Sequence, residues 1–194
     1  MEWNFLFFVN SIFLGVGLAM DAFSVSVANG LNDSSMKIGK ELLIASTFAI
    51  FQIAMPLIGW VCVHSFVSYF TFFERFIPWI ALLLLLYIGI SMIKGAGKDE
   101  NNGTSAQLSF KALILQGIAT SIDALSVGFT IAEYQLPMAL TASFLIGLVT
   151  FIICYAGIKI GKVFGNKFSG KAEIAGGIIL IIIGAEIFLK GILA

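Results

Sequence analysis

The stretch Met20-Asp21-Ala22-Phe23-Ser24-Val25 places a carboxylate in the middle of a long apolar segment. About half a chain later, Ile122-Asp123-Ala124-Leu125-Ser126-Val127 repeats the same pattern in a second apolar segment. A carboxylate at the centre of a membrane-spanning helix costs about 2.5–3.5 kcal/mol on insertion scales. Two such residues in matching contexts predict a role connected with something that crosses the membrane. A duplication that produced only a structural scaffold would not explain why both midpoints carry aspartate.

The composition is that of a membrane protein. The chain has 194 residues, of which 59% are hydrophobic and 11% charged, and its mean hydropathy is +1.03. Soluble domains carry about 25% charged residues, so little of this chain is expected to form a soluble domain. The formal net charge of zero gives no electrostatic basis for binding nucleic acid. Cys62 and Cys154 both fall in apolar segments, which predicts buried reduced thiols and neither a disulfide nor a thiolate metal site.

The apolar pattern predicts an all-α polytopic membrane protein with six transmembrane helices. The segments that approach or exceed the roughly 20 apolar residues needed to span a bilayer lie near 5–29, 40–63, 75–94, 109–132, 137–160 and 172–193. A polar linker at 97–108, expected in the cytoplasm, divides the chain into 1–96 and 109–194, with three helices each. An odd number of helices per half requires the second half to be inverted relative to the first. Inverted repeats around a midplane polar site are an architecture of many secondary transporters.

The distribution of positive charges predicts the orientation. The expected loops on one side, with the adjoining helix ends, carry nine lysines and the other side carries only Arg75 and Lys190. The nine are Lys37, Lys40, Lys94, Lys98, Lys111, Lys159, Lys162, Lys167 and Lys171. By the positive-inside rule the first, third and fifth loops face the cytoplasm and both termini face out. We expect a multi-pass protein of the bacterial inner membrane.

Asp21 and Asp123 are the first candidates for a metal site. Each lies in the first helix of its half, so pseudo-symmetry is expected to bring the two carboxylates face to face. Facing carboxylates repel one another unless a cation lies between them or one is protonated. The alternative is a protonated aspartate in each helix, bonded to a neighbouring hydroxyl.

Five further residues complete the candidate metal-binding set. Ser24, Thr120 and Ser126 either line a path or allow close helix packing. Gln52 lies four residues before Pro56, which lacks the N–H that would bond the Gln52 carbonyl. The freed carbonyl and the side-chain amide of Gln52 either form a pair of oxygen ligands or belong to an ordinary proline kink. Glu186, near the outer end of the last helix, is either part of the site or a proton relay, or a peripheral charge.

Oxygen donors without clustered Cys or His favour hard divalent cations such as Mn²⁺, Mg²⁺ or Ca²⁺. The cation would be the transported substrate, and no resident cofactor is expected. No P-loop or soluble catalytic domain is apparent, so the chain is not expected to be an enzyme. An intramembrane aspartyl enzyme would need a Tyr-Asp or Gly-x-Gly-Asp context, which is lacking. The remaining alternatives are an exporter of a small solute, although no Lys or Arg lies at mid-membrane, and a non-transporting membrane scaffold.

Four motifs resemble a known family. They are Met20-Asp21-Ala22-Phe23, Pro56-Leu57-Ile58-Gly59-Trp60, Thr120-Ser121-Ile122-Asp123-Ala124-Leu125-Ser126-Val127-Gly128 and Lys171-Ala172-Glu173-Ile174-Ala175-Gly176-Gly177. In this order they are similar to the MntP family of bacterial manganese efflux pumps, within the LysE-like exporter group. The resemblance covers essentially the whole chain.

That resemblance implies export of Mn²⁺ across the inner membrane, with Asp21 and Asp123 as the family's intramembrane acids. One position departs from the family, whose members carry a glutamate where this chain has Gln52. We hypothesise that Glu186 compensates for the missing charge. The expected partners are the metal ion and the lipid bilayer, and the sequence leaves open whether the chain forms a homo-oligomer.

Overall fold

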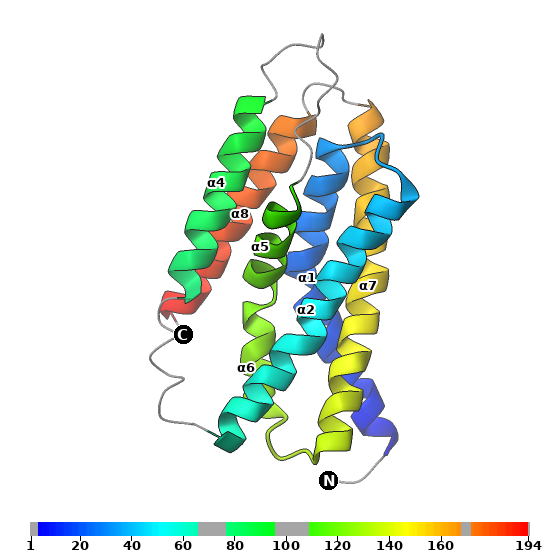
Figure 1. The fold of residues 1–194 in the computed structure, drawn as a ribbon, viewed down its shortest axis with the longest axis vertical. Helices are drawn as coiled ribbons and strands as arrows, with labels where there is room; N and C mark the ends of the chain where they lie inside the picture. The colour runs from blue at the N-terminus through cyan, green and yellow to red at the C-terminus, as the bar shows by residue number, and fades with distance from the viewer. Residues whose placement is uncertain (1–3, 66–76, 96–108, 168–171, 194) are drawn as a thin grey trace.

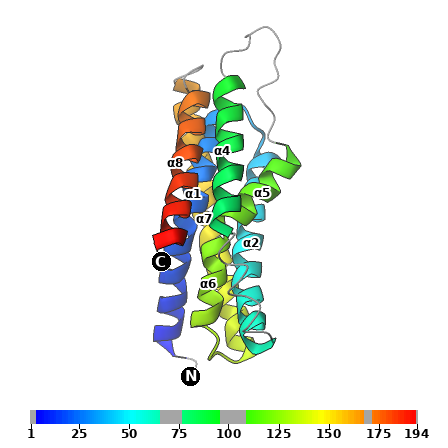
Figure 2. The same cartoon turned by 90° about the vertical axis from the view of Figure 1, so that its left-hand side faces the viewer.

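The computed structural model describes residues 4–65, 77–95, 109–167 and 172–193. All regular elements in these ranges are α-helices, and together they form an elongated bundle (Figures 1 and 2). They are α1 (Phe5–Asn32), α2 (Ile38–Ser65), α4 (Ile77–Gly95), α5 (Phe110–Thr120), α6 (Ile122–Thr130), α7 (Leu136–Lys167) and α8 (Ala172–Leu193). The predicted helical class is confirmed. The expected linker at 97–108 lies outside the described residues.

Membrane-spanning length is met by several of these helices. Within the described ranges, α1, α2 and α7 are long and apolar enough to cross a bilayer. The pair α5 and α6 makes a fourth span if the bent pair counts as one. The helices α4 and α8, of 19 and 22 residues, occupy the positions of the third and sixth expected spans. The fourth expected span is therefore a broken helix, and α7 continues seven residues beyond the expected boundary at 160.

The two ends of the bundle differ in charge. The α1–α2 turn, the end of α4 and the start of α8 lie at the same end as the last turns of α7 (Figure 1). Lys37 and Lys40 at the turn and Lys159 and Lys162 on α7 lie there, and we call it the lysine-rich end. Helix α1 begins at the opposite end and α8 runs toward it (Figure 1). We call this opposite end the N-terminal end.

Helices from the two halves of the chain interleave. The longest shared interface joins α1 to α7, and α2 packs on both α6 and α7. Two crossings rely on glycine. A Cβ added at Gly161 of α7 would lie 3.0 Å from the Gly30 Cα of α1, and one added at Gly128 of α6 would lie 2.6 Å from the Gly59 Cα of α2. Only residues without a side chain allow backbones to approach so closely.

The apolar core is concentrated toward the lysine-rich end. The largest cluster joins α1, α2, α4, α5, α7 and α8. It includes Val25, Ile44, Phe48, Ile158 and Leu180, each no more than 1% exposed. A smaller cluster around Leu18, Ala124 and Ile146, and another around Phe7, Met138 and Ala142, lie progressively nearer the N-terminal end. Among the described residues, the buried apolar clusters therefore become smaller from the lysine-rich end toward the N-terminal end.

Candidate functional site

A buried amide joins the two aspartate-bearing helices. The Gln52 Nε2 of α2 donates to the Leu18 carbonyl of α1 at 3.0 Å and to the Thr120 carbonyl of α5 at 3.2 Å. Gln52 is only 1% exposed. Leu18 lies three residues before Asp21, and Thr120 lies three residues before Asp123. The amide thus contacts equivalent positions of the two matching segments.

The direction of helical carbonyls places this amide beside the aspartates. A carbonyl in an α-helix points along the axis toward the residue four positions later. The Leu18 oxygen therefore lies level with the turn that carries Asp21. Thr120 is the last residue of α5, so its carbonyl oxygen lies at the helix break that precedes Asp123. The structure thus places the segments that carry Asp21 and Asp123 on either side of the Gln52 amide. That the two carboxylates face one another stays a prediction.

The Gln52 amide presents its oxygen to the interior. Because Nε2 faces two carbonyl oxygens, exchanging the amide oxygen and nitrogen would create two repulsive contacts, which fixes the assignment. Oε1 is buried, and no donor within the described part of the chain hydrogen-bonds to it. A buried acceptor without a donor is rare and costs free energy. It is the kind of atom that a bound cation would satisfy.

Helix continuity is lost beside Asp123. The bend between α5 and α6 is 43°, and Ser121 at the break has φ −112° and ψ 8°. The Ser121 hydroxyl donates to the Gly117 carbonyl at 2.7 Å, and the Thr120 hydroxyl donates to the Gln116 carbonyl at 2.9 Å. These hydroxyls satisfy carbonyls around the break, as short polar side chains do in interrupted membrane helices.

Asp123 occupies the first turn of α6, and its carboxylate accepts the Ala124 N–H at 2.9 Å. The unpaired N–H groups and the positive end of the helix dipole at this position favour a negative charge. Asp123 is exposed in the isolated chain, and Asp21, in the middle of α1, is partly exposed. Neither of the two predicted carboxylates is therefore fully buried, whereas the Gln52 amide is.

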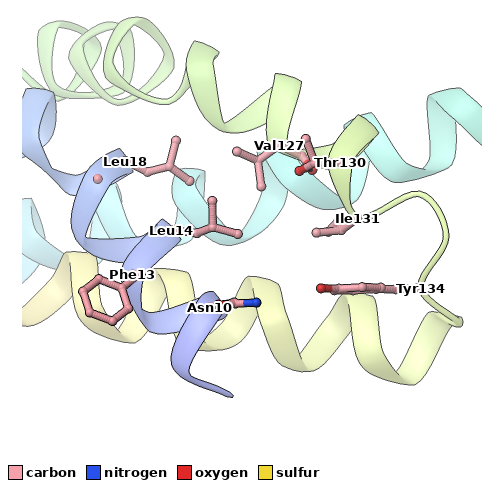
Figure 3. Close-up of a pocket in the computed structure, with 9 residues that line it drawn as sticks. Asn10, Phe13, Leu14, Leu18, Val127, Thr130, Ile131 and Tyr134 are labelled. Carbon is pink, nitrogen blue, oxygen red and sulfur yellow. Dashed lines mark hydrogen bonds between the residues drawn. The ribbon is translucent and has the colours of Figure 1, made fainter. Parts of the chain in front are cut away.

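A pocket of about 600 Å³ opens between α1 and α6 on the N-terminal side of Gln52. Its lining includes Leu14 and Leu18 from α1 and Val127 from α6, with Asn10 and Tyr134 at the end away from Gln52. The Asn10 amide and the Tyr134 hydroxyl point toward one another there (Figure 3). Asp123 precedes Val127 by four residues, and Asp21 follows Leu18 by three. Both aspartates therefore lie on the helix faces that line the pocket, one turn farther in.

The other candidates are placed as follows. The Ser24 hydroxyl donates to the Met20 carbonyl at 3.1 Å, and the Thr120 hydroxyl is used at the helix break, so both form local backbone bonds. Ser126 is exposed, three residues after Asp123. Glu186 belongs to α8, but its side chain lies outside the described part of the structure. Within the described residues, no three His, Cys, Asp or Glu side chains cluster closely enough to hold a metal. A cation at this site would therefore depend on neutral oxygens as well as carboxylates.

Two polar features were missed by sequence reasoning. The Asn29 Nδ2 donates to the Gln116 Oε1 at 2.9 Å, and the Gln116 Nε2 approaches the Asn29 Oδ1 at 3.4 Å. Gln116 could have been noticed, because it is a polar residue inside an apolar segment, as Gln52 is.

The second is an ion pair between α2 and α7. The buried Glu41 carboxylate contacts the Lys159 ammonium at 2.7 Å and also pairs with Lys162. The Lys162 ammonium donates in addition to the Met36 carbonyl at 2.7 Å. The single carboxylate offsets part of the positive charge of Lys159 and Lys162 and ties this part of α7 to α2.

Helices of membrane-spanning length, one of them broken beside a buried polar crossing, define a polytopic helical membrane protein with a polar site in its interior. Residues 35–188 match the model of the Mntp family, which is described as "Putative manganese efflux pump". The chain belongs to this family, which confirms the resemblance drawn from its motifs.

Curated relatives agree along nearly the whole length. A "Putative manganese efflux pump MntP" of Methanobrevibacter smithii is 41% identical over 184 residues, covering 93% of this chain and 96% of the relative. The protein of the same description from Crocosphaera subtropica is 42% identical over 186 residues, covering 95% and 97%. That from Ruminiclostridium cellulolyticum is 41% identical over 181 residues, covering 92% and 94%. No solved structure matches the chain significantly.

Proposed function

We propose that this protein exports Mn²⁺ from the cytoplasm across the cytoplasmic membrane as a secondary transporter. The substrate is proposed from the names of its relatives. The transport path is proposed from the polar site around Gln52. The observation that carries the path is the Gln52 amide, which binds equivalent carbonyls of the two aspartate-bearing helices and leaves its buried oxygen without a donor. Asp21 and Asp123 supply the negative charge, and Gln52 Oε1 supplies a neutral ligand between them. Ser24, Thr120 and Ser126 offer further oxygens.

The proposed architecture is two inverted three-helix repeats. Asp21 and Asp123 are separated by 102 residues, and so are Gly59 and Gly161. Each of these glycines packs closely on a glycine of the first helix in the opposite half: Gly59 on Gly128, and Gly161 on Gly30. The matched crossings support a pseudo-two-fold relation whose axis passes near Gln52.

The proposed orientation places the lysine-rich end in the cytoplasm and both termini outside. It rests on the positive-inside rule. The pocket between α1 and α6 then lies on the outer side of Gln52. A carboxylate-bearing solute would need a positive group, but no Lys or Arg is among the nine residues that line this pocket. The lining therefore offers no positive partner for the carboxylate of an amino acid.

The direct test is manganese accumulation in a bacterial host that lacks its own exporter. Cells that express the wild-type chain should hold less Mn and survive Mn stress better than cells with an empty vector. Asp21→Asn and Asp123→Asn should each abolish this effect, because a divalent ion would lose half of its countercharge.

The matched control is Asp33→Asn, which removes an acid at the lysine-rich end that pairs with Lys40 at 2.8 Å. This variant should export normally at equal membrane abundance. If cells that express the wild-type chain contain less of a different metal and unchanged Mn, the substrate would be reassigned and the proposed site would stand. Unchanged export in both aspartate variants would refute the path.

A further inference from the structure

We propose that the Asn29–Gln116 amide pair is the cytoplasmic gate of this path, so that both are positioning residues for transport. The inference rests on the proposed function and orientation. Asn29 lies eight residues beyond Asp21 on α1, and Gln116 lies seven residues before Asp123 on α5. At 1.5 Å per residue, both are about 10–12 Å from the aspartates, on the same side. The pair therefore closes the space between the two aspartate-bearing helices on their cytoplasmic side.

The pair is buried among residues of the largest apolar cluster in the described part of the bundle. Asn29 is 2% exposed and Gln116 is fully buried. Val25 and Ala28 of α1 and Leu113 and Ala119 of α5, which flank the two amides in sequence, all belong to the largest apolar cluster. A two-way amide contact thus lies among mainly apolar neighbours. It joins residues 87 positions apart in the chain.

The opposite side of the aspartates is hollow. There the pocket of about 600 Å³ lies between α1 and α6, and the Asn10 amide and the Tyr134 hydroxyl point toward one another across it (Figure 3). One side of the site is sealed by a polar contact and the other is hollowed by a pocket. This is the arrangement expected for the outward-facing half of an alternating-access cycle.

Neutral amides suit such a gate chemically. A carboxylate–lysine pair at this position would either hold a passing cation or repel it. An amide pair satisfies its own donors and acceptors when closed, so it does not compete for the ion. When it parts, the Asn29 Oδ1 and Gln116 Oε1 become free oxygen ligands on the cytoplasmic approach to Asp21 and Asp123.

The test measures access to cysteine reporters and needs no metal. In a background with Cys62→Ala and Cys154→Ala, Gly17→Cys reports on the outer pocket, where an added Cβ meets nothing within 4 Å. Val25→Cys reports on the inner side, because Val25 is fully buried on α1, four residues after Asp21 and four before Asn29, and therefore lies on the same helix face as both. A membrane-impermeant maleimide is applied to right-side-out vesicles for the first reporter and to inside-out vesicles for the second.

We expect Asn29→Ala and Gln116→Ala each to raise labelling of the inner reporter by about five- to tenfold, the population change that loss of one buried hydrogen bond produces. Labelling of the outer reporter should fall. The double alanine variant should change labelling no more than either single variant, because both remove the same contact. The exchanged pair, Asn29→Gln with Gln116→Asn, should restore wild-type labelling. If an alanine variant does not reach the membrane, Asn29→Ser takes its place with the same expectation.

Equal increases at both reporters would show general loosening and overturn the gate, as would unchanged labelling in the single variants. The two proposals fail separately. If the wild-type chain does not export Mn but labelling rises at the inner reporter and falls at the outer one in the alanine variants, the manganese substrate would be wrong and the gate would stand. Normal export with unchanged labelling would remove the gate and keep the transporter.

Discussion

The close crossing of α6 and α2 can be tested by adding a single methyl group. In Gly128→Ala, the new Cβ would lie 2.5 Å from the Pro56 carbonyl oxygen and 2.6 Å from the Gly59 Cα. Ordinary van der Waals contact begins at 3.4 Å, so the two backbones would have to separate by about 0.9 Å to relieve the shorter contact. Both contacted atoms belong to the backbone, so a rotamer change cannot relieve the overlap. A gap of 0.5–1 Å already forfeits about a quarter to a half of the contact energy along the interface.

Gly17→Ala is the matched control, because its Cβ would meet nothing within 4 Å. Both substitutions replace glycine by alanine within a helix, so the gain in helix propensity is similar and cancels in the comparison. What remains is the overpacking cost, about 1–3 kcal/mol. For a chain of this size, about 2–4 °C of melting temperature is lost per kcal/mol. We therefore expect Gly128→Ala to melt about 2–12 °C below Gly17→Ala.

The assay is thermal unfolding of the purified protein in detergent, followed by intrinsic fluorescence or by aggregation. Because α6 carries Asp123, Gly128→Ala should also weaken metal export beyond its effect on abundance. Equal melting temperatures for the two alanine variants would refute the argument that this crossing requires glycine.

Two further stability predictions use the buried polar contacts. Glu41→Gln leaves two lysines of α7 without their carboxylate, so it should lower the melting temperature more than Asp33→Asn, which removes a less buried carboxylate. The lower melting temperature should persist in 1 M salt. A smaller decrease than that of Asp33→Asn would contradict the prediction. Gln52→Leu leaves the Leu18 and Thr120 carbonyls without their side-chain donor and should cost about 1–3 kcal/mol in unfolding experiments, whereas Gln52→Glu, which can donate one bond when protonated, should cost less. A leucine variant as stable as wild type would indicate that the amide is not needed for helix packing.

The sequence predicts the helices well because apolar length is a local property. The expected start of each span lies within two residues of an observed helix for all six segments. The break at Ser121 was harder to foresee, because no proline or glycine occupies the position and hydroxyl side chains satisfy the backbone instead. Conversely, Pro56 lies inside α2, which continues through it.

The site itself could be predicted only in part. Aspartates in an apolar segment are visible from sequence alone, since their burial cost marks them. Which amides accompany them depends on how distant helices meet, and local pattern does not encode the pairing of Asn29 with Gln116 or the position of Gln52 between two carbonyls. The positions of Asp21 and Asp123 around Gln52 follow from the structure, while their role as ligands stays a prediction.

The interleaving of the two halves also has a consequence for biosynthesis. Gly30 of α1 and Gly161 of α7 are 131 residues apart in the chain, yet they form one of the closest contacts in the bundle. At ribosomal rates of 5–20 residues per second, α7 emerges about 7–26 s after α1. During that interval α1 must remain in or beside the membrane with Asp21 and Asn29 deprived of their final surroundings. Until the second half is synthesised, lipid headgroups, water or the insertion machinery must therefore solvate these polar side chains of the first half.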